Sequence, residues 1–189
     1  MLDDKMKYIN NIYLNEINND FVKILKPLTN DKRIDLYDKD ILKNYNYYFD
    51  KNINLIVSNP PFTAWVDNKE LNNGYLFFLY AIYRIGMKNS NYSKKPIIYI
   101  IMPLTYYDKE KNNLKIPSKT RIDIIKYFKK VDKEKNISYG FYDEDLDEND
   151  NWFFNVKIVK EILSFKKYDV KQSKISDMKL KTALFEFMI

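Results

Sequence analysis

Two apolar runs that end at prolines constrain the fold of this chain more than any other feature. Residues 52–58 are followed by Asn59, Pro60 and Pro61, and residues 97–102 are followed by Pro103. Proline lacks a backbone donor and disfavours a helical conformation in the residue before it, so each run is predicted to be a strand that stops there. Apolar residues at helical spacing predict a helix over 75–88 between them. The order strand, helix, strand predicts two neighbouring parallel strands.

The rest of the chain continues this alternation. Strands are predicted over 11–17, 33–37, 137–142 and 152–159, and helices over 21–28 and 119–131, with Asn18-Asn19-Asp20 and Ser118 as helix caps. Residues 63–73 and 104–117 are predicted to be a loop and an irregular segment. The predicted fold is α/β, with a mostly parallel sheet covered on both faces and a C-terminal antiparallel hairpin. We predict one domain over residues 1–168 and a tail over 169–189.

The composition excludes several classes of chemistry. The chain has no cysteine and no histidine, which removes disulfides, thiolate metal sites and the commonest general base. No metal site is therefore expected. No apolar stretch reaches about 20 residues, so no membrane partner is expected. The first residues are too polar for a signal peptide, and an intracellular, soluble protein is predicted.

The net charge of +6 is carried almost entirely by lysine. Such a charge favours a polyanionic partner, because lysines that contact phosphates release counterions. Abundant Lys, Asn, Ile and Tyr together are also what an A/T-rich genome encodes. The charge alone therefore leaves nucleic-acid binding and codon bias as alternatives.

Asn59-Pro60-Pro61-Phe62 is the segment whose chemistry is most informative. The asparagine offers one side-chain acceptor and two donors, while the prolines keep free carbonyl acceptors. Phe62 offers a flat apolar face. Together these groups suit a planar base with an exocyclic amine, which donates to Asn59 and Pro60 while the ring stacks on Phe62. The structural alternative is a strand that ends at prolines before a loop.

This segment resembles motif IV of the class I S-adenosylmethionine-dependent methyltransferases, whose Asn-Pro-Pro-Phe/Tyr form is typical of enzymes that methylate a planar nitrogen. The resemblance implies a Rossmann-like sheet, S-adenosyl-L-methionine as cofactor, and Asn59, Pro60 and Phe62 as catalytic residues. Pro61, Trp65 and Tyr75 would lie on the substrate side, although Trp65 and Tyr75 suit a core better. Family substrates include adenine N6 in DNA or RNA, guanine N2 in ribosomal RNA and protein glutamine.

The resemblance extends to two segments before Asn59. Glu16 lies near the end of the strand predicted over 11–17 and matches the carboxylate that binds the ribose hydroxyls of the cofactor. Asp40 and Ile41 match the residues that bind and pack against its adenine, with Asp38 as a competing register. Alternatively, Glu16 favours the N-terminus of the following helix.

The Gly-rich first motif of the family is missing, because all three glycines, Gly74, Gly86 and Gly140, follow the Asn-Pro-Pro-Phe segment. The chain could lack a first strand that a partner chain supplies, be a non-catalytic member, or use residues 7–17 as a glycine-free first strand. We predict an amino-methyltransferase-like protein acting on nucleic acid, with adenine N6 preferred. A non-catalytic subunit of a larger assembly and a protein glutamine methyltransferase are the alternatives.

Overall fold

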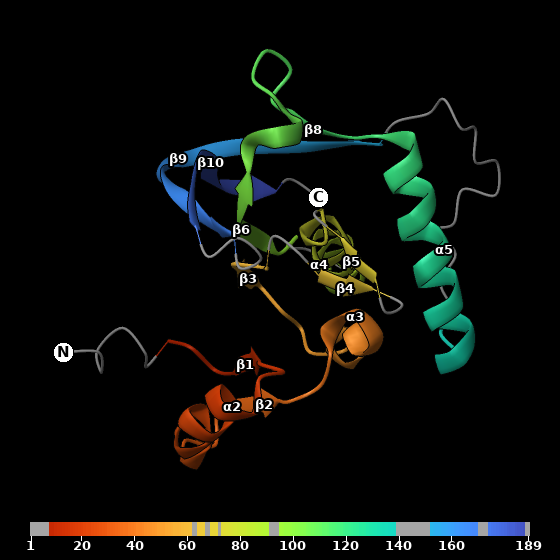
Figure 1. Ribbon diagram of the computed structural model, residues 1–189. Helices are drawn as coiled ribbons and strands as arrows, with labels where there is room; N and C mark the ends of the chain where they lie inside the picture. Colours follow the sequence, from red (N-terminus) through yellow and green to blue (C-terminus); the bar gives the residue numbers. More distant parts are fainter. Residues whose placement is uncertain are drawn as a thin grey trace. The chain divides into compact units, whose positions relative to one another are not determined.

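The computed structural model describes residues 8–61, 64–66, 69–71, 73–90, 95–138, 152–169 and 174–187. They form two compact units, Met1–Tyr45 and Asn46–Ile189, named here the N-terminal and C-terminal units. Figure 1 shows the elements in chain order. The elements of the N-terminal unit are β1 (Ile12–Asn15), α2 (Asn19–Leu25), a 3₁₀ helix (Lys26–Asn30), β2 (Ile34–Tyr37) and α3 (Ile41–Asn44).

The C-terminal unit begins within a second 3₁₀ helix, Tyr45–Tyr48. Its remaining elements in chain order are β3 (Leu55–Ser58), β4 (Ala64–Val66), β5 (Lys69–Leu71), α4 (Tyr75–Asn89), β6 (Ile97–Pro103), a 3₁₀ helix (Leu104–Tyr106), β7 (Tyr107–Asp108), β8 (Asn113–Ile116), α5 (Ser118–Lys135), β9 (Trp152–Asp169) and β10 (Lys174–Phe187).

A six-stranded sheet in the order β3-β6-β10-β9-β8-β7 organises the C-terminal unit. β3 and β6 are parallel, with Leu55 beside Ile97 and Ser58 beside Ile100. The predicted parallel pair is therefore confirmed, and α4 lies between the two strands in the sequence. The other four pairs of this sheet are antiparallel. The α/β class is confirmed, and the antiparallel part of the sheet is larger than the sequence predicts.

The closing hairpin differs from the predicted one. β9 pairs with β10. Of the segment 137–142, which was predicted to form the hairpin with it, residues 137 and 138 are not in a strand and the others lie outside the described residues. β10 also pairs with β6, so the last strand of the chain lies inside the sheet, next to the parallel pair. The segment that the sequence predicts as a tail, residues 169–189, thus contributes a central strand. Figure 1 shows β9 and β10 as long blue strands beside β6.

The core of the C-terminal unit includes residues on one face of the sheet and on helices α4 and α5. Ile98, Ile100 and Met102 of β6 are fully buried, as are Ala183 and Phe185 of β10. On the opposite face, Ile97 is 48% exposed. The sheet was predicted to be covered by helices on both faces. Among the described residues, only one face is fully buried. An uncovered apolar face is unusual for parallel strands, which are normally buried on both sides.

Helices α4 and α5 contact each other through aromatic rings and one ion pair. The ring of Phe77 lies 5.6 Å from that of Tyr127, and the ring of Tyr80 lies 5.0 Å from that of Phe128. Helix α5 ends at Lys135, four residues beyond the predicted end, because its buried positions continue to Asp132. Ser118 is the first residue of the helix and not its cap; the cap position is Pro117, whose carbonyl accepts from the Arg121 N–H.

Two segments predicted without regular structure contain strands. β4 and β5 form an antiparallel hairpin within the predicted loop 63–73. β7 and β8 form another within 104–117, and β8 continues into the main sheet by pairing with β9. These strands have two to four residues each, which is too short for the alternation of polar and apolar residues to identify them. Within the described ranges, no helix is long and apolar enough to cross a membrane.

Candidate functional site

The predicted amine-binding segment begins immediately after β3. β3 ends at Ser58, so Asn59 is the first residue beyond the carboxyl end of the strand. Asn59 is exposed, Pro60 is buried and Pro61 is exposed. The Asn59 amide makes no hydrogen bond with another described residue. A buried Pro60 beside an exposed Asn59 fixes the backbone and presents the amide to solvent.

The aromatic residues of the predicted substrate side are only partly placed. Phe62 lies outside the described residues. Trp65 is the middle residue of β4, where its backbone pairs with Glu70, and its side chain is also outside the described set. Tyr75, at the first position of α4, is 3% exposed and belongs to the core, where burial, with the nearby Tyr106, raises its pKa. The roles of Phe62 and Trp65 stay predictions.

Glu16 lies at the carboxyl end of β1, as the sequence predicts. Its backbone N–H donates to the Tyr37 carbonyl at 3.2 Å, because β1 and β2 are parallel and end at the same edge. The Glu16 carboxylate accepts from the Asn18 N–H at 2.7 Å through Oε1. Asn18 is the N-cap of α2 and accepts from two backbone N–H groups of that helix. Glu16 therefore stabilises the start of the helix, whatever else it binds.

Asp40 has a comparable local role at the next strand end. It is the N-cap of α3, and its Oδ1 accepts from the Leu42 N–H at 2.9 Å. Its own carbonyl accepts from the Asn44 side chain at 2.9 Å. Ile41 follows it as the first residue of α3 and is half-buried. Asp38, the competing register, is exposed and pairs with Lys39 at 3.3 Å.

Asn15 connects these two strand ends and was not predicted as a site residue. Its Nδ2 donates to the carbonyl of Tyr37 at 3.0 Å and to that of Lys39 at 2.9 Å. The side chain thus holds the segment between β2 and Asp40 beside the end of β1. A polar amide near the end of a predicted strand, three residues before a helix cap, was the available signal.

The predicted residues therefore fall into two separate groups. Glu16, Asp40 and Ile41 belong to the N-terminal unit, whereas Asn59, Pro60 and Pro61 belong to the C-terminal unit. In both units the residues lie where parallel strands end, which is where open α/β sheets bind ligands. The structure brings Glu16 and Asp40 to one edge through Asn15.

Helix α5 carries a basic surface that the sequence analysis did not single out. Its inner face holds buried residues such as Ile124 and Phe128, while its outer face exposes lysines. Exposed lysines at helical spacing are Lys119, Lys126, Lys129, Lys130, Lys133 and Lys135. The exposed acidic residues of the same helix are Asp123 and Glu134. This lysine face has the charge and spacing that phosphate contacts require.

A buried ion pair connects α4 and α5 at the opposite face of this helix. The Arg84 guanidinium donates to the Asp132 carboxylate at 2.7 Å, and both side chains are almost fully buried. Burial raises the pKa of Asp132 to about 7, while the guanidinium favours the ionised form and opposes that rise. The rings of Tyr80 and Phe128 lie 5.8 Å from the guanidinium carbon. An ion pair that is buried among aromatic rings in this way indicates a structural role for Arg84 and Asp132, and not a catalytic one.

Comparison with known proteins identifies no family for this chain. No family model matches it, and no curated protein shows significant sequence similarity to it.

Proposed function

We propose that this chain is a methyltransferase-like protein that methylates an exocyclic amine in nucleic acid, with adenine N6 as the preferred target and S-adenosyl-L-methionine as the methyl donor. The observation that carries the proposal is the exposed amide of Asn59, held between a parallel strand and buried Pro60 at the carboxyl end of β3. A Rossmann-like arrangement is supported by the parallel β3–β6 pair and by the antiparallel β9–β10 hairpin at the end of the chain.

The fit to the cofactor is incomplete. Glu16 and Asp40 carry carboxylates at the ends of β1 and β2, where the resemblance assigns the ribose and adenine. Each carboxylate already accepts one backbone hydrogen bond, so part of its capacity is used. The chain offers no glycine before residue 74 for close backbone approach to the methionine end. The described residues therefore suit the adenosine half only.

The chain's own residues would act by positioning the amine. The bound cofactor would supply an electrophilic methyl group on a sulfonium. Asn59 Oδ1 and the Pro60 carbonyl would each accept a hydrogen of the amine, which directs its lone pair toward the methyl group. The transfer would exchange the C–S bond of the donor for an N–C bond to the amine, whose surplus proton would pass to water. This is catalysis by proximity and a preorganised hydrogen bond.

Replacing Asn59 tests this proposal, and Asn54 provides a matched control at the other end of the same strand. Asn59→Ala is expected to lower methyl transfer by about two orders of magnitude or more, as the loss of one preorganised hydrogen bond does. Asn54→Ala, also at an exposed position, should retain the activity. The assay measures a labelled methyl group transferred to DNA and RNA oligonucleotides. Full activity in Asn59→Ala would show that the segment is structural.

The lysine face of α5 supports nucleic acid over protein as the substrate. Replacing Lys126, Lys130 and Lys133 by Glu should weaken oligonucleotide binding and lower its salt dependence by about one unit of slope per lost phosphate contact. The control carries the same charge change on the β7–β8 hairpin, at the exposed residues Lys109, Lys111 and Lys115. Equal losses in both variants would indicate net charge and not a binding face. A glutamine-containing peptide as the better methyl acceptor would favour the protein alternative.

A non-catalytic subunit is the second candidate, and the absence of glycine before residue 74 favours it. Because each 1.4 kcal/mol is about tenfold in affinity, losing two or three contacts at the methionine end should weaken cofactor binding by two orders of magnitude or more. Isothermal titration of the isolated protein is thus expected to show weak binding or none. Micromolar binding without a partner would mean that residues 7–17 form an unusual first motif and that Glu16 has another role.

A further inference from the structure

The two edges of the six-stranded sheet are very different. At one edge, β7 has two residues, Tyr107 and Asp108, and a strand this short offers little backbone for pairing. At the other edge, β3 has the apolar sequence Leu55-Ile56-Val57-Ser58. Lysine, proline or a bulge within an edge strand normally prevents further pairing, and β3 contains none of them. Among the described residues of the C-terminal unit, β6 is the strand that pairs with β3, so the other side of β3 can accept an additional strand.

The backbone direction within β3 identifies the groups that such a strand would meet. The Ile97 N–H donates to the Asn54 carbonyl at 2.9 Å, so Asn54 directs its backbone toward β6. Backbone direction alternates along a strand in a parallel ladder, so Ile56 also faces β6. Leu55 and Val57 then direct their N–H and C=O groups away from β6, toward the open edge.

The side chains of the same two residues are also exposed. Leu55 is 55% exposed and Val57 is 70% exposed, and Ile97, which lies beside Leu55 in the register, is 48% exposed. Apolar side chains next to outward-facing backbone groups are the features by which a sheet edge accepts an extended peptide. The backbone provides affinity and the apolar side chains provide contact area.

We propose that the β3 edge is a docking site for a strand donated by a second, acidic polypeptide, whose backbone pairs with Leu55 and Val57. The net charge of +6 opposes association of two copies of this chain and favours a partner of opposite charge. The proposal rests on the sheet edge and does not depend on methyl transfer. If the proposed function is also correct, the donated strand corresponds to the alternative in which a partner chain supplies the first strand.

Two measurements on the full chain test the site. Amide exchange followed by NMR should show faster exchange at Leu55 and Val57 than at Ile56, which faces β6. The probe is a fluorescein-labelled synthetic peptide of alternating valine and threonine with glutamates at both ends. Its binding should slow exchange at Leu55 and Val57 and leave exchange at Ile56 unchanged.

Val57→Pro removes one outward-facing donor and should weaken binding of this peptide about tenfold or more. Proline is tolerated where the N–H of an edge strand faces solvent, so the variant should keep the thermal stability of the natural protein. Ile56→Pro, which removes a bond to β6, should be destabilised. Val159→Ala, at an exposed apolar position of β9, should leave binding unchanged. Should Val57→Pro fail to fold, N-methylation of alternate peptide amides provides the same test from the other side.

Three outcomes would overturn the proposal. One is slow exchange at Leu55 and Val57 in the protein alone together with a dimer in sedimentation, which would assign the edge to a second copy. Another is peptide binding that is indifferent to both Val57→Pro and peptide N-methylation. The third is an absence of binding at millimolar peptide. A loss of methyl transfer in Asn59→Ala bears on none of these measurements, so the two proposals can fail separately.

Discussion

The two units of the chain are stabilised in different ways. In the N-terminal unit, Leu42 and Tyr45 are the buried residues among those described, and Phe21 and Ile24 of α2 are more than half exposed. In the C-terminal unit, ten of the fifteen residues of α4 are buried. A unit with so little buried surface depends on local hydrogen bonds, whereas a unit with a core depends on long-range packing.

Most side-chain hydrogen bonds of the N-terminal unit are accordingly short in sequence separation, although Asn15 and Arg33 also donate to carbonyls 22 to 24 residues away. Asn18 caps α2, Asp40 caps α3, and Asp31 binds Arg33 two residues away. In the C-terminal unit the comparable contact joins Arg84 to Asp132, which are 48 residues apart. Local contacts form with little loss of chain entropy, but each contributes little to global stability. The comparison predicts large mutational effects in one unit and small ones in the other.

The largest effect is expected from breaking the buried pair. Asp132→Ala leaves the Arg84 guanidinium buried without its carboxylate, which should lower the free energy of unfolding by about 3–5 kcal/mol. Denaturant unfolding at about pH 8, above the raised pKa of Asp132, measures this loss in the free energy of unfolding. The control is Asp123→Ala, an exposed aspartate of the same helix, which should change stability by less than about 0.5 kcal/mol.

A double replacement tests whether the cost comes from the unpaired charge. Arg84→Met combined with Asp132→Leu substitutes apolar side chains for both partners and should recover most of the lost stability. A double variant as unstable as Asp132→Ala would mean that hydrogen bonds to other groups dominate. In that case the core of the C-terminal unit would depend on polar contacts as the N-terminal unit does.

The same contrast explains which features could be predicted from the sequence. The Asn18 cap, the strand before Asn59 and the parallel pairing of β3 with β6 follow from short patterns of apolar residues, prolines and caps. The position of β10 could not be predicted, because pairing with β6 connects residues about eighty positions apart. In the last twenty residues only 180–188 show a pattern, and it suits a docking strand or a helix. The β4–β5 hairpin was not predicted, because strands of three residues are too short to show an alternation of polar and apolar residues.

Within the candidate site, too, the residues marked by local sequence patterns were predicted and those that depend on distant contacts were not. Asn59, Glu16 and Asp40 were predicted at strand ends, and each lies at or just beyond one, because proline and polar residues mark where strands stop. Asn15 was missed, because its function depends on carbonyls 22 and 24 residues away. The lysine face of α5 required knowledge of which helix face is buried.

A smaller effect is expected from removing a helix cap in the N-terminal unit. The Asn18 Oδ1 accepts from the Asp20 N–H at 2.9 Å and from the Phe21 N–H at 3.4 Å. Asn18→Ala should destabilise α2 by about 1 kcal/mol, which amide exchange over this helix measures. Exchange in α4 should stay unchanged. A global loss of stability would contradict the view that the N-terminal unit is held by local contacts.

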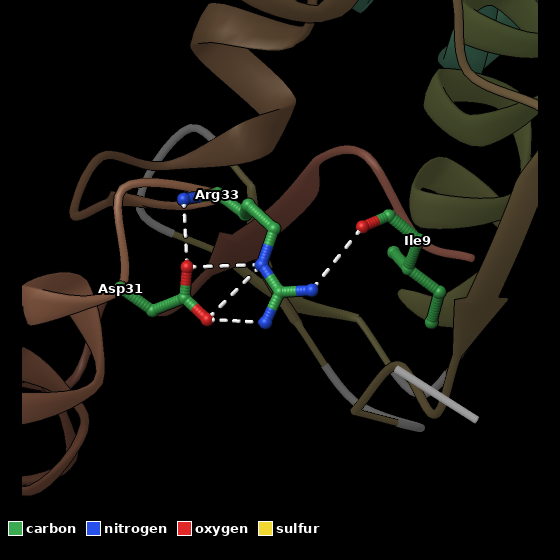
Figure 2. A network of polar contacts seen from close by, with 3 residues as sticks. All are labelled: Ile9, Asp31 and Arg33. Carbon is green, nitrogen blue, oxygen red and sulfur yellow. Dashed lines mark hydrogen bonds and ion pairs between the residues drawn. The ribbon is translucent and has the colours of Figure 1, made fainter. Parts of the chain in front are cut away.

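The smallest effect concerns the Asp31–Arg33 pair, which Figure 2 shows as a fork of hydrogen bonds. Arg33 Nη2 donates to Asp31 Oδ2 at 2.6 Å, Arg33 Nε donates to both carboxylate oxygens, and the Arg33 N–H donates to Oδ1 at 3.0 Å. Arg33 Nη1 reaches the Ile9 carbonyl at 3.5 Å. These hydrogen bonds lower the pKa of Asp31 from 3.8 to about 2, the side-chain bonds more than the backbone bond.

The sign of the pH effect follows from this lowered pKa. A carboxyl group whose pKa is lower in the folded state stabilises that state above its unfolded pKa of about 4, and the contribution is lost as the pH falls through about 2. Arg33→Gln should return the pKa of Asp31 most of the way to 3.8, since the backbone N–H remains as a donor. Lys32→Gln, an exposed neighbour, should leave it at about 2. NMR titration of the Asp31 carboxyl measures the pKa in both variants.

Because the Asp31–Arg33 pair is exposed, the global stability of either variant should change little. A large change would show that this surface contact orders the whole N-terminal unit.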